Sequence, residues 1–160
     1  MKRIDKILNH DLFNKLLSKN NAYERDRIFC RHNMEHFLSV ARIAQILNLK
    51  QKLKLDKALV YGAALLHDIG RFRQYEDGTP HESASARLAG PILRDSGFTR
   101  EETELILDAI RNHRNGEIQK EKSLRGILYR ADKLSRSCFA CPVEQDCNWK
   151  GNKKNLKLRY

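Results

Sequence analysis

Apolar residues recur along most of this chain at intervals of three and four, the spacing that places side chains on one face of an α-helix. Only three prolines and eight glycines interrupt the pattern in 160 residues. We therefore predict an all-α fold, a bundle of about six main helices. The predicted helices are one or two short N-terminal ones that break near residues 10 and 11, followed by helices over about 33–48, 56–67, 82–94, 99–113 and 123–134.

Polar side chains stand where several of these helices should begin. Asp56 and Ser123 can each cap a helix N-terminus, and Thr99 with Glu102 fits the capping-box pattern. Pro91 would kink or divide the helix over 82–94. A chain of this length can bury a core in a single domain. We assign that domain to residues 1–147 and expect residues 148–160 to form a basic, mobile tail.

The chain is strongly basic, with 31 Lys and Arg against 20 Asp and Glu and a formal net charge of +11. This charge favours anionic partners such as phosphates, nucleic acids or membrane surfaces without choosing among them, and it also suits a merely soluble surface. The N-terminus lacks the apolar block of a secretory signal, and the longest apolar run, 59–66, is too short to span a bilayer. We expect a cytoplasmic protein with no membrane partner.

The stretch AALLHDIGRF, residues 63–72, carries an imidazole and a carboxylate at the end of an apolar segment. Buried polar groups of this kind need a partner, a proton or a metal ion. Similar groups stand at or beside apolar stripes in other predicted helices, so that four histidines and two aspartates could converge. The candidate metal ligands are His36, His67, Asp68, His81, His113 and Asp132.

This combination of side chains suits divalent transition metals such as Fe, Mn, Zn, Co or Ni, because neutral imidazole and carboxylate oxygen are their usual ligands. Six ligands exceed what one open catalytic ion needs, whereas two ions about 3.5–4 Å apart would use all six if Asp68 bridged them. Adjacent helical side chains point about 100° apart, so His67 and Asp68 can both be ligands only where the helix relaxes. The following Ile69 and Gly70 allow the helix to end there.

Five segments between residues 36 and 136 together resemble the motifs of the HD-domain superfamily of metal-dependent phosphohydrolases. They are HFLSVARIA, AALLHDIGRF, HESASARLAGPIL, AIRNH and YRADKLSR. The resemblance implies a first metal ion with the ligands His36, His67, Asp68 and Asp132. It also implies that His81 and His113 hold a second ion, as the matching residues do in binuclear members. The pattern is similar to the branch that includes bacterial dinucleoside tetraphosphate hydrolases.

Structural roles compete with these functional ones. A second His-Asp pair, His10 and Asp11, lacks the apolar lead-in and the Ile-Gly exit, so we interpret it as a surface or helix-capping pair. His81 follows DGTP and can open a helix without binding metal, and His113 can be a helix-end histidine. If either is structural, the site would hold one ion.

Residues beside the ligand motifs are candidates for catalysis and for holding a phosphate. Asp68 and Arg71 are the catalytic candidates, and Arg71 is the first choice for substrate binding because a guanidinium can fork onto phosphate oxygens. The further substrate-binding candidates are His32, Lys133 and Arg136. A salt-bridged or solvated surface position is the competing interpretation for each of these side chains.

The segment SCFACPVEQDCNW places three cysteines in a C-x2-C-x5-C array, and a fourth lies far upstream. The four are Cys30, Cys138, Cys141 and Cys147. Cys30 lies six residues before His36 and Cys138 six residues after Asp132, so the two cysteines would meet if His36 and Asp132 share an ion on antiparallel helices. We expect either a zinc or iron–sulfur site here, or reduced thiols packed under the tail.

The function expected from these observations is a metal-dependent phosphohydrolase: a phosphatase, nucleotidase or phosphodiesterase. Its partner would be a small phosphorylated substrate, a nucleotide or similar molecule, cleaved at a phosphoester or phosphoanhydride by a metal-activated water. The alternative is a non-catalytic protein on the same scaffold that binds nucleic acid or a signal nucleotide. The Lys-rich tail favours this alternative, and the intact ligand set disfavours it.

Overall fold

A computed structural model describes all of residues 1–160, and it confirms the all-α prediction, with no β-strand in the chain. The α-helices are α1 (Lys2–Leu8), α2 (Asp11–Tyr23), α3 (Met34–Lys50), α4 (Lys57–Leu66), α5 (Phe72–Asp77), α6 (His81–Asp95), α7 (Arg100–Asn112) and α8 (Leu124–Leu134). The short 3-10 helices are η1 (Gly116–Lys120), η2 (Cys138–Ala140) and η3 (Gly151–Lys153). None of the helices has both the length and the apolar character that crossing a bilayer requires.

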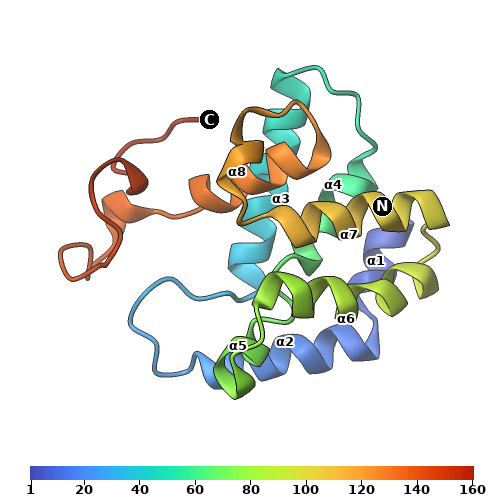
Figure 1. The fold of residues 1–160 in the computed structure, drawn as a ribbon, viewed down its shortest axis with the longest axis horizontal. Helices are drawn as coiled ribbons and strands as arrows, with labels where there is room; N and C mark the ends of the chain where they lie inside the picture. The colour runs from blue at the N-terminus through green and yellow to red at the C-terminus, as the bar shows by residue number, and fades with distance from the viewer.

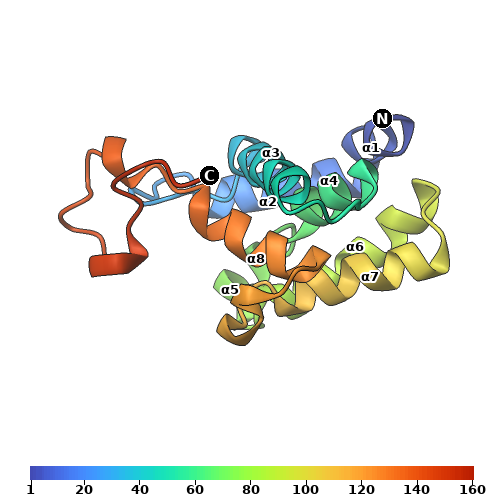
Figure 2. The same cartoon turned by 90° about the horizontal axis from the view of Figure 1, so that it is seen from above.

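The helices pack around one apolar core. Helix α3 lies against α4 and α8, and α7 lies against α6 and α8, so that α8 joins the two halves of the bundle. Figure 2 shows α3 and α4 on one side of the molecule and α6 and α7 on the other. A single cluster of 31 buried apolar residues fills the space between them. All the helices that carry candidate metal ligands therefore contact this one core.

The predicted caps are present. Asp56 and Ser123 accept hydrogen bonds from backbone N–H groups at the starts of α4 and α8, and Thr99 forms a complete capping box with Glu102. His10 caps α2 by accepting a hydrogen bond from the N–H of Leu12, which confirms the structural interpretation of the His10–Asp11 pair. Helix α6 continues through its internal proline without being divided.

Helix α5 has only six residues and was not predicted from the apolar spacing. It follows the turn that carries His67 and Asp68, and a buried asparagine of α2 holds both ends of this connection. Asn20 donates a hydrogen bond from Nδ2 to the carbonyl of Asp68 (2.9 Å) and accepts one at Oδ1 from the N–H of Phe72 (2.8 Å). The turn is thus fixed by a residue almost fifty positions away in sequence, which no local pattern indicates.

The C-terminal segment returns to the end of α8. Asn155 is buried, and its Nδ2 donates hydrogen bonds to the carbonyls of Lys133 (2.6 Å) and Arg136 (3.1 Å). The loop before α3, residues 24–33, lies beside this C-terminal segment in both views of the fold (Figures 1 and 2). These two segments project from the bundle on the same side. The division of the chain at residue 147 stays a prediction.

A close backbone approach explains the glycine of the HDIG turn. A Cβ on Gly70 would lie 2.6 Å from the backbone nitrogen of Ser85 and 2.8 Å from the carbonyl carbon of Ala84, both in α6. The N–H of Gly70 also donates a hydrogen bond to Ser85 Oγ at 2.9 Å. The turn therefore rests directly on the α6 backbone.

We expect Gly70→Ala to lower the free energy of unfolding by about 1–3 kcal/mol, because the added methyl group meets backbone atoms that cannot move aside. Urea denaturation followed by circular dichroism measures this change. Gly116→Ala is the matched control, since its nearest neighbour is Tyr129 Oη at 3.8 Å, and we expect a change within about 0.5 kcal/mol. Equal effects of the two substitutions would contradict the packing argument.

Candidate metal centre

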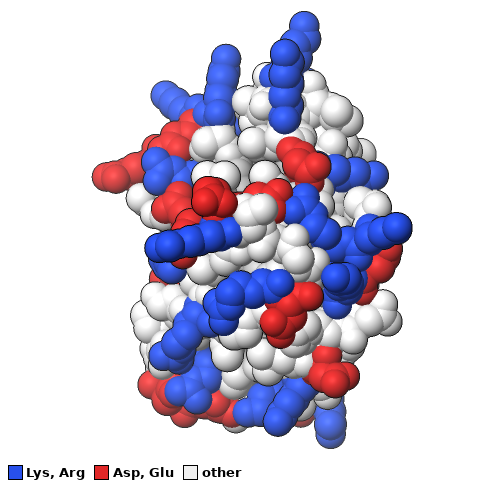
Figure 3. All heavy atoms as spheres, turned by 90° about the vertical axis from the view of Figure 1, so that its right-hand side faces the viewer, with Lys and Arg blue, Asp and Glu red and all other residues white.

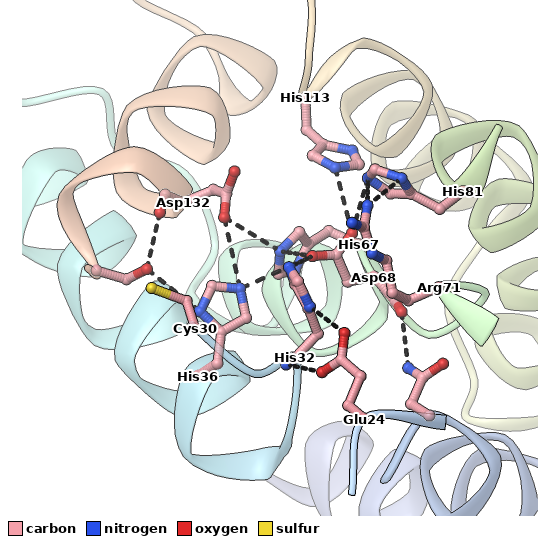
Figure 4. A network of polar contacts seen from close by, with 12 residues as sticks. Glu24, Cys30, His32, His36, His67, Asp68, Arg71, His81, His113 and Asp132 are labelled. Carbon is pink, nitrogen blue, oxygen red and sulfur yellow. Dashed lines mark hydrogen bonds and ion pairs between the residues drawn. The ribbon is translucent and has the colours of Figure 1, made fainter. Parts of the chain in front are cut away.

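The six predicted ligands come together in one place, although they lie on five separate stretches of the chain (Figure 4). Asp132 lies in the last turns of α8, and His36 in the first turn of α3. The α4–α5 turn supplies the His-Asp pair, His81 begins α6, and His113 directly follows α7. None of the six residues is more than 8% exposed, so their polar atoms face one another rather than bulk water.

Four of them form a first group whose ligand atoms lie within 4.8 Å of one another, namely His36, His67, Asp68 and Asp132. Nε2 of His36 lies 3.4 Å from Oδ1 of Asp132, and Nε2 of His67 lies 3.2 Å from Oδ2 of Asp68. The cross distances are 3.8 Å from His36 to Asp68 and 3.7 Å from His67 to Asp132.

A second group shares Asp68 with the first. Its other carboxylate oxygen, Oδ1, lies 3.1 Å from Nε2 of His81 and 3.4 Å from Nε2 of His113. One oxygen of Asp68 therefore faces the first group, and the other faces the second. Asp68 thus offers one oxygen to each of the two groups.

Hydrogen bonds fix the tautomers of two of the histidines. Nδ1 of His67 lies 2.7 Å from the carbonyl of Ala64, and Nδ1 of His113 lies 2.6 Å from the carbonyl of Ile110. Because a carbonyl only accepts, the proton of each neutral ring is on Nδ1. In the neutral rings the lone pairs are therefore on the Nε2 atoms, which lie on the side of Asp68, as in metal-binding histidines.

His36 is oriented by a serine that the sequence did not indicate. Ser135 Oγ donates a hydrogen bond to the carbonyl of Asp132 (2.7 Å) and lies 3.3 Å from Nδ1 of His36. Since the serine proton is engaged, Oγ can accept the proton of His36 Nδ1. This contact directs the lone pair of His36 Nε2 into the site.

The site contains buried polar atoms that have no hydrogen-bond partner. They are Nε2 of His36, Nε2 of His67 and Oδ1 of Asp68. Unsatisfied buried groups are costly and therefore rare in folded proteins. Here three of them belong to the candidate ligands of one site, and the two histidine nitrogens need a metal ion or a proton. The residues present thus fit a bound divalent metal ion.

The electrostatics of the site likewise call for positive charge. Burial alone would raise the pKa of Asp68, but His67 and His32 keep it well below its usual range. Burial likewise raises the pKa of Asp132, and Lys133 with the histidines more than reverses the effect. Burial disfavours the charged form of His67, yet the two aspartates outweigh it and raise the pKa of His67 to about 10. Two ionised carboxylates thus stabilise positive charge between them.

The side chain of Arg71 lies against the second group. Its Nη1 is 2.6 Å from Nδ1 of His81 and 3.1 Å from Oε1 of Gln74, which itself lies 2.6 Å from the same imidazole nitrogen. Burial lowers the pKa of His81 to about 3, and the positive charge of Arg71 contributes in the same direction. His81 is therefore neutral at physiological pH, which is the state that binds a metal ion.

His32 and a buried glutamate form a pair beside the first group. Glu24 accepts hydrogen bonds at 2.6 Å from both the backbone N–H and Nδ1 of His32, and at 2.7 Å from Tyr75 Oη. Nε2 of His32 then faces the site, 3.7 Å from Oδ2 of Asp68 and 3.4 Å from Nη2 of Arg136. His32 is thus buried, which excludes the exposed position that the sequence left open.

A cavity of about 460 Å³ opens over both groups of ligands. Its lining is cationic, with the side chains of Arg27, Arg71, Arg114, Lys133 and Arg136. Asp68, His81, His113 and Asp132 line its floor, and Phe29 and Trp149 contribute aromatic walls. The predicted substrate-binding residues His32, Arg71, Lys133 and Arg136 all border this cavity.

Sequence reasoning missed several residues that shape the site. Glu24 and Asn20 lie in or just after α2, far from any ligand motif, and act through side-chain contacts that no spacing encodes. Arg27 and Trp149 reach the cavity from loops. Only Arg114 could have been found from the sequence, because it is a basic residue directly after the ligand candidate His113.

The fold and the site together define a helical protein with a buried histidine–aspartate site for metal ions. A family model described as HD domain matches residues 33–137, and the chain belongs to this family of metal-dependent phosphohydrolases. All six candidate ligands lie inside the match. A Clostridium beijerinckii protein described as "Uncharacterized protein" is 44% identical over 160 residues, the full length of both chains. No solved structure matches the chain.

The buried glutamate beside the site gives a pH-dependent prediction. Burial would raise the pKa of Glu24, but the hydrogen bonds from His32 and Tyr75 lower it to about 2. A carboxylate whose pKa is lower in the folded state stabilises the fold above its unfolded pKa of about 4.3, and loses this effect as the pH falls toward 2. We expect Glu24→Gln to lower the free energy of unfolding by about 2–3 kcal/mol at pH 7.

The difference between wild type and Glu24→Gln should shrink as the pH falls from about 4.5 to 2, in urea denaturation at a series of pH values. Glu104→Gln is the control, since its side chain is 65% exposed and its only ion pair is 4.0 Å long. We expect a change within about 0.5 kcal/mol for the control. A difference that stays constant with pH would show that Glu24 is not ionised in the folded protein.

Proposed function

We propose that this protein is a hydrolase of small phosphorylated substrates, and that the substrate is a nucleotide or a similar molecule. The observation that carries the proposal is the position of Asp68, whose two carboxylate oxygens face two separate histidine groups on the floor of a cationic cavity. Membership of the HD-domain family supports the reaction class. The dinucleoside tetraphosphate hydrolase branch stays a prediction.

The residues that would hold the metal ions are those of the two groups. His36, His67 and Asp132 would hold one ion, His81 and His113 a second, and Asp68 would be common to both. A bound divalent cation supplies a site where water loses its proton easily and where negative charge on a phosphate is neutralised. The carbonyls and hydroxyl that fix the histidine rings keep the ligand nitrogens in place for this task.

The walls of the cavity supply positively charged side chains for binding a phosphate. Arg71 borders the second group, and Lys133 with Arg136 borders the first, so a phosphate on the cavity floor would meet cations on both sides. Their charges would stabilise the negative charge that spreads over phosphate oxygens during transfer. Arg71 would also orient the substrate, because its guanidinium can donate two parallel hydrogen bonds.

The size and the aromatic wall of the cavity support a substrate larger than phosphate alone. A volume of about 460 Å³ lies in the range of small-molecule sites, about 300–1,000 Å³. Phe29 and Trp149 line the cavity together with the arginines, and a nucleobase can stack on such rings. A molecule with a phosphate at the metal end and a base at the aromatic end would use both features.

The alternative, a protein that binds nucleic acid without turnover, finds less support. Figure 3 shows that, on the face opposite the C-terminal segment, Lys and Arg side chains alternate with Asp and Glu. A backbone-binding surface for nucleic acid is normally a continuous basic stripe. Five Lys and Arg side chains gather instead around a cavity above the ligands, where a small phosphorylated molecule would fit.

We expect Asp68→Asn to reduce phosphate release from nucleotides by at least about 100-fold, because the shared ligand of both groups loses its charge. Activity is measured on a panel of phosphate monoesters, nucleotides and dinucleotides with Mn²⁺ or Fe²⁺, with and without chelator. Asp11→Asn in the second His-Asp pair is the matched control and should keep full activity. Trp149, the single tryptophan, reports binding by its fluorescence. Nucleotide binding without turnover in wild-type protein would favour the non-catalytic alternative.

Arg71→Ala should raise KM for the phosphorylated substrate about 10- to 100-fold, as expected when a charge-assisted contact to the ligand is lost. Arg73→Ala is the matched control, because Arg73 pairs with Glu76 and Asp77 on α5 and does not line the cavity. Steady-state kinetics over a range of substrate concentrations separates KM from kcat. Equal changes in both variants would exclude a direct contact between Arg71 and substrate.

A further inference from the structure

All four cysteines of the chain line one small cavity of about 40 Å³. Cys30 comes from the loop before α3, and the segment after α8 supplies Cys138, Cys141 and Cys147. More than one hundred residues separate the first from the others in sequence, so the tertiary structure alone brings them to one place. None of them is in a disulfide.

The segment that carries three of these cysteines has almost no apolar core of its own. Between Lys133 and Lys154 no residue is buried, and the only helical elements there are the short η2 and η3. Phe139, the large apolar residue of η2, is 52% exposed. A segment that buries so little normally needs a disulfide or a metal ion to stay folded.

The charges around the cavity suit a group of thiolate ligands. Lys154 lines the cavity, and it also donates a hydrogen bond to the carbonyl of Glu144 at 2.6 Å. Arg136 and Cys30 both line the larger cavity next to it. A centre of four thiolates and a metal carries net negative charge, which such cations offset.

The spacing of the sulfur atoms bears on the kind of centre. None of the groups of ligand atoms that lie within 4.8 Å of one another includes a cysteine. A tetrahedral zinc ion with bonds of about 2.3 Å needs its sulfur ligands about 3.8 Å apart, so zinc would require the thiols to move inward. An iron–sulfur cluster holds four thiolates on separate iron atoms and spans a wider space.

We propose that Cys30, Cys138, Cys141 and Cys147 form a second metal centre, ligated by thiolates and distinct from the histidine–aspartate site. The wider spacing favours an iron–sulfur cluster over a single zinc ion. All four residues lie outside the HD-domain match over 33–137, so the centre is an addition to the family scaffold. The proposal does not depend on the phosphohydrolase assignment.

The position of this centre gives it a structural role in the larger cavity. Cys30, Cys138 and Cys147 also line the 460 Å³ cavity over the histidine–aspartate site. A metal centre at these residues joins the loop that holds Arg27 and Phe29 to the segment that holds Trp149. It therefore holds the loop before α3 and the segment after α8 together where they line the cavity.

Metal analysis of four forms of the full-length protein, each purified without oxygen, tests the proposal. These are wild type, Cys138→Ser/Cys141→Ser, His67→Ala/Asp68→Ala, and the combination of all four substitutions. A cluster predicts about four iron and four sulfide per chain with broad visible absorption, whereas zinc predicts one colourless equivalent. This metal should disappear in the cysteine variant and persist when the histidine–aspartate pair is replaced.

Thiol accessibility in the wild-type protein gives a second measurement that does not depend on how the variants fold. The four thiols should resist alkylation in the isolated protein and become reactive once a chelator or mild oxidation removes the metal. Four thiols that react at once, together with a metal content unchanged by Cys138→Ser/Cys141→Ser, would overturn the proposal. Wild-type protein that holds the cysteine metal but hydrolyses none of the phosphorylated substrates would instead count against the proposed function alone.

Discussion

The carboxylate of Asp68 is the group on which the rest of the site depends. It is buried beside a second aspartate, and its two oxygens face histidines that come from both halves of the bundle. Two ionised carboxylates in a buried place are stable only with positive charge between them. That requirement is met when the histidine nitrogens that face Asp68 carry a proton or a metal ion, and it explains why lysine and arginine stand at the rim.

The fold is arranged so that this carboxylate cannot move away. Helix α4 ends one residue before His67, and the turn that follows is held from two sides, by Asn20 of α2 and by Ser85 of α6. Gly70 lets the turn lie directly on the α6 backbone. The apolar core behind it fixes the helices that carry the other ligands. Rigid placement of this kind is what a metal site requires of its protein.

The candidate metal ligands and part of the cavity wall lie in different parts of the chain relative to the HD-domain match. The ligands lie within the HD-domain match, whereas Arg27, Phe29 and Trp149 lie outside it in two loops that project beside each other. Substrate selection would thus rest on segments that a family comparison does not cover. The same two loops bring the four cysteines together.

The sequence by itself determined the main helices and indicated the candidate ligands. The apolar period and the caps at Asp56, Thr99 and Ser123 follow from residues near one another in the chain, and the six histidines and aspartates lie beside apolar stripes in motifs that resemble those of a known family. Only the tertiary structure decided how Asp68 divides its oxygens between two groups and that Asn20 and Glu24 support the site. It also decided that Cys30 meets the C-terminal cysteines at one cavity. These features rest on contacts between side chains far apart in sequence, and such contacts leave no periodic pattern.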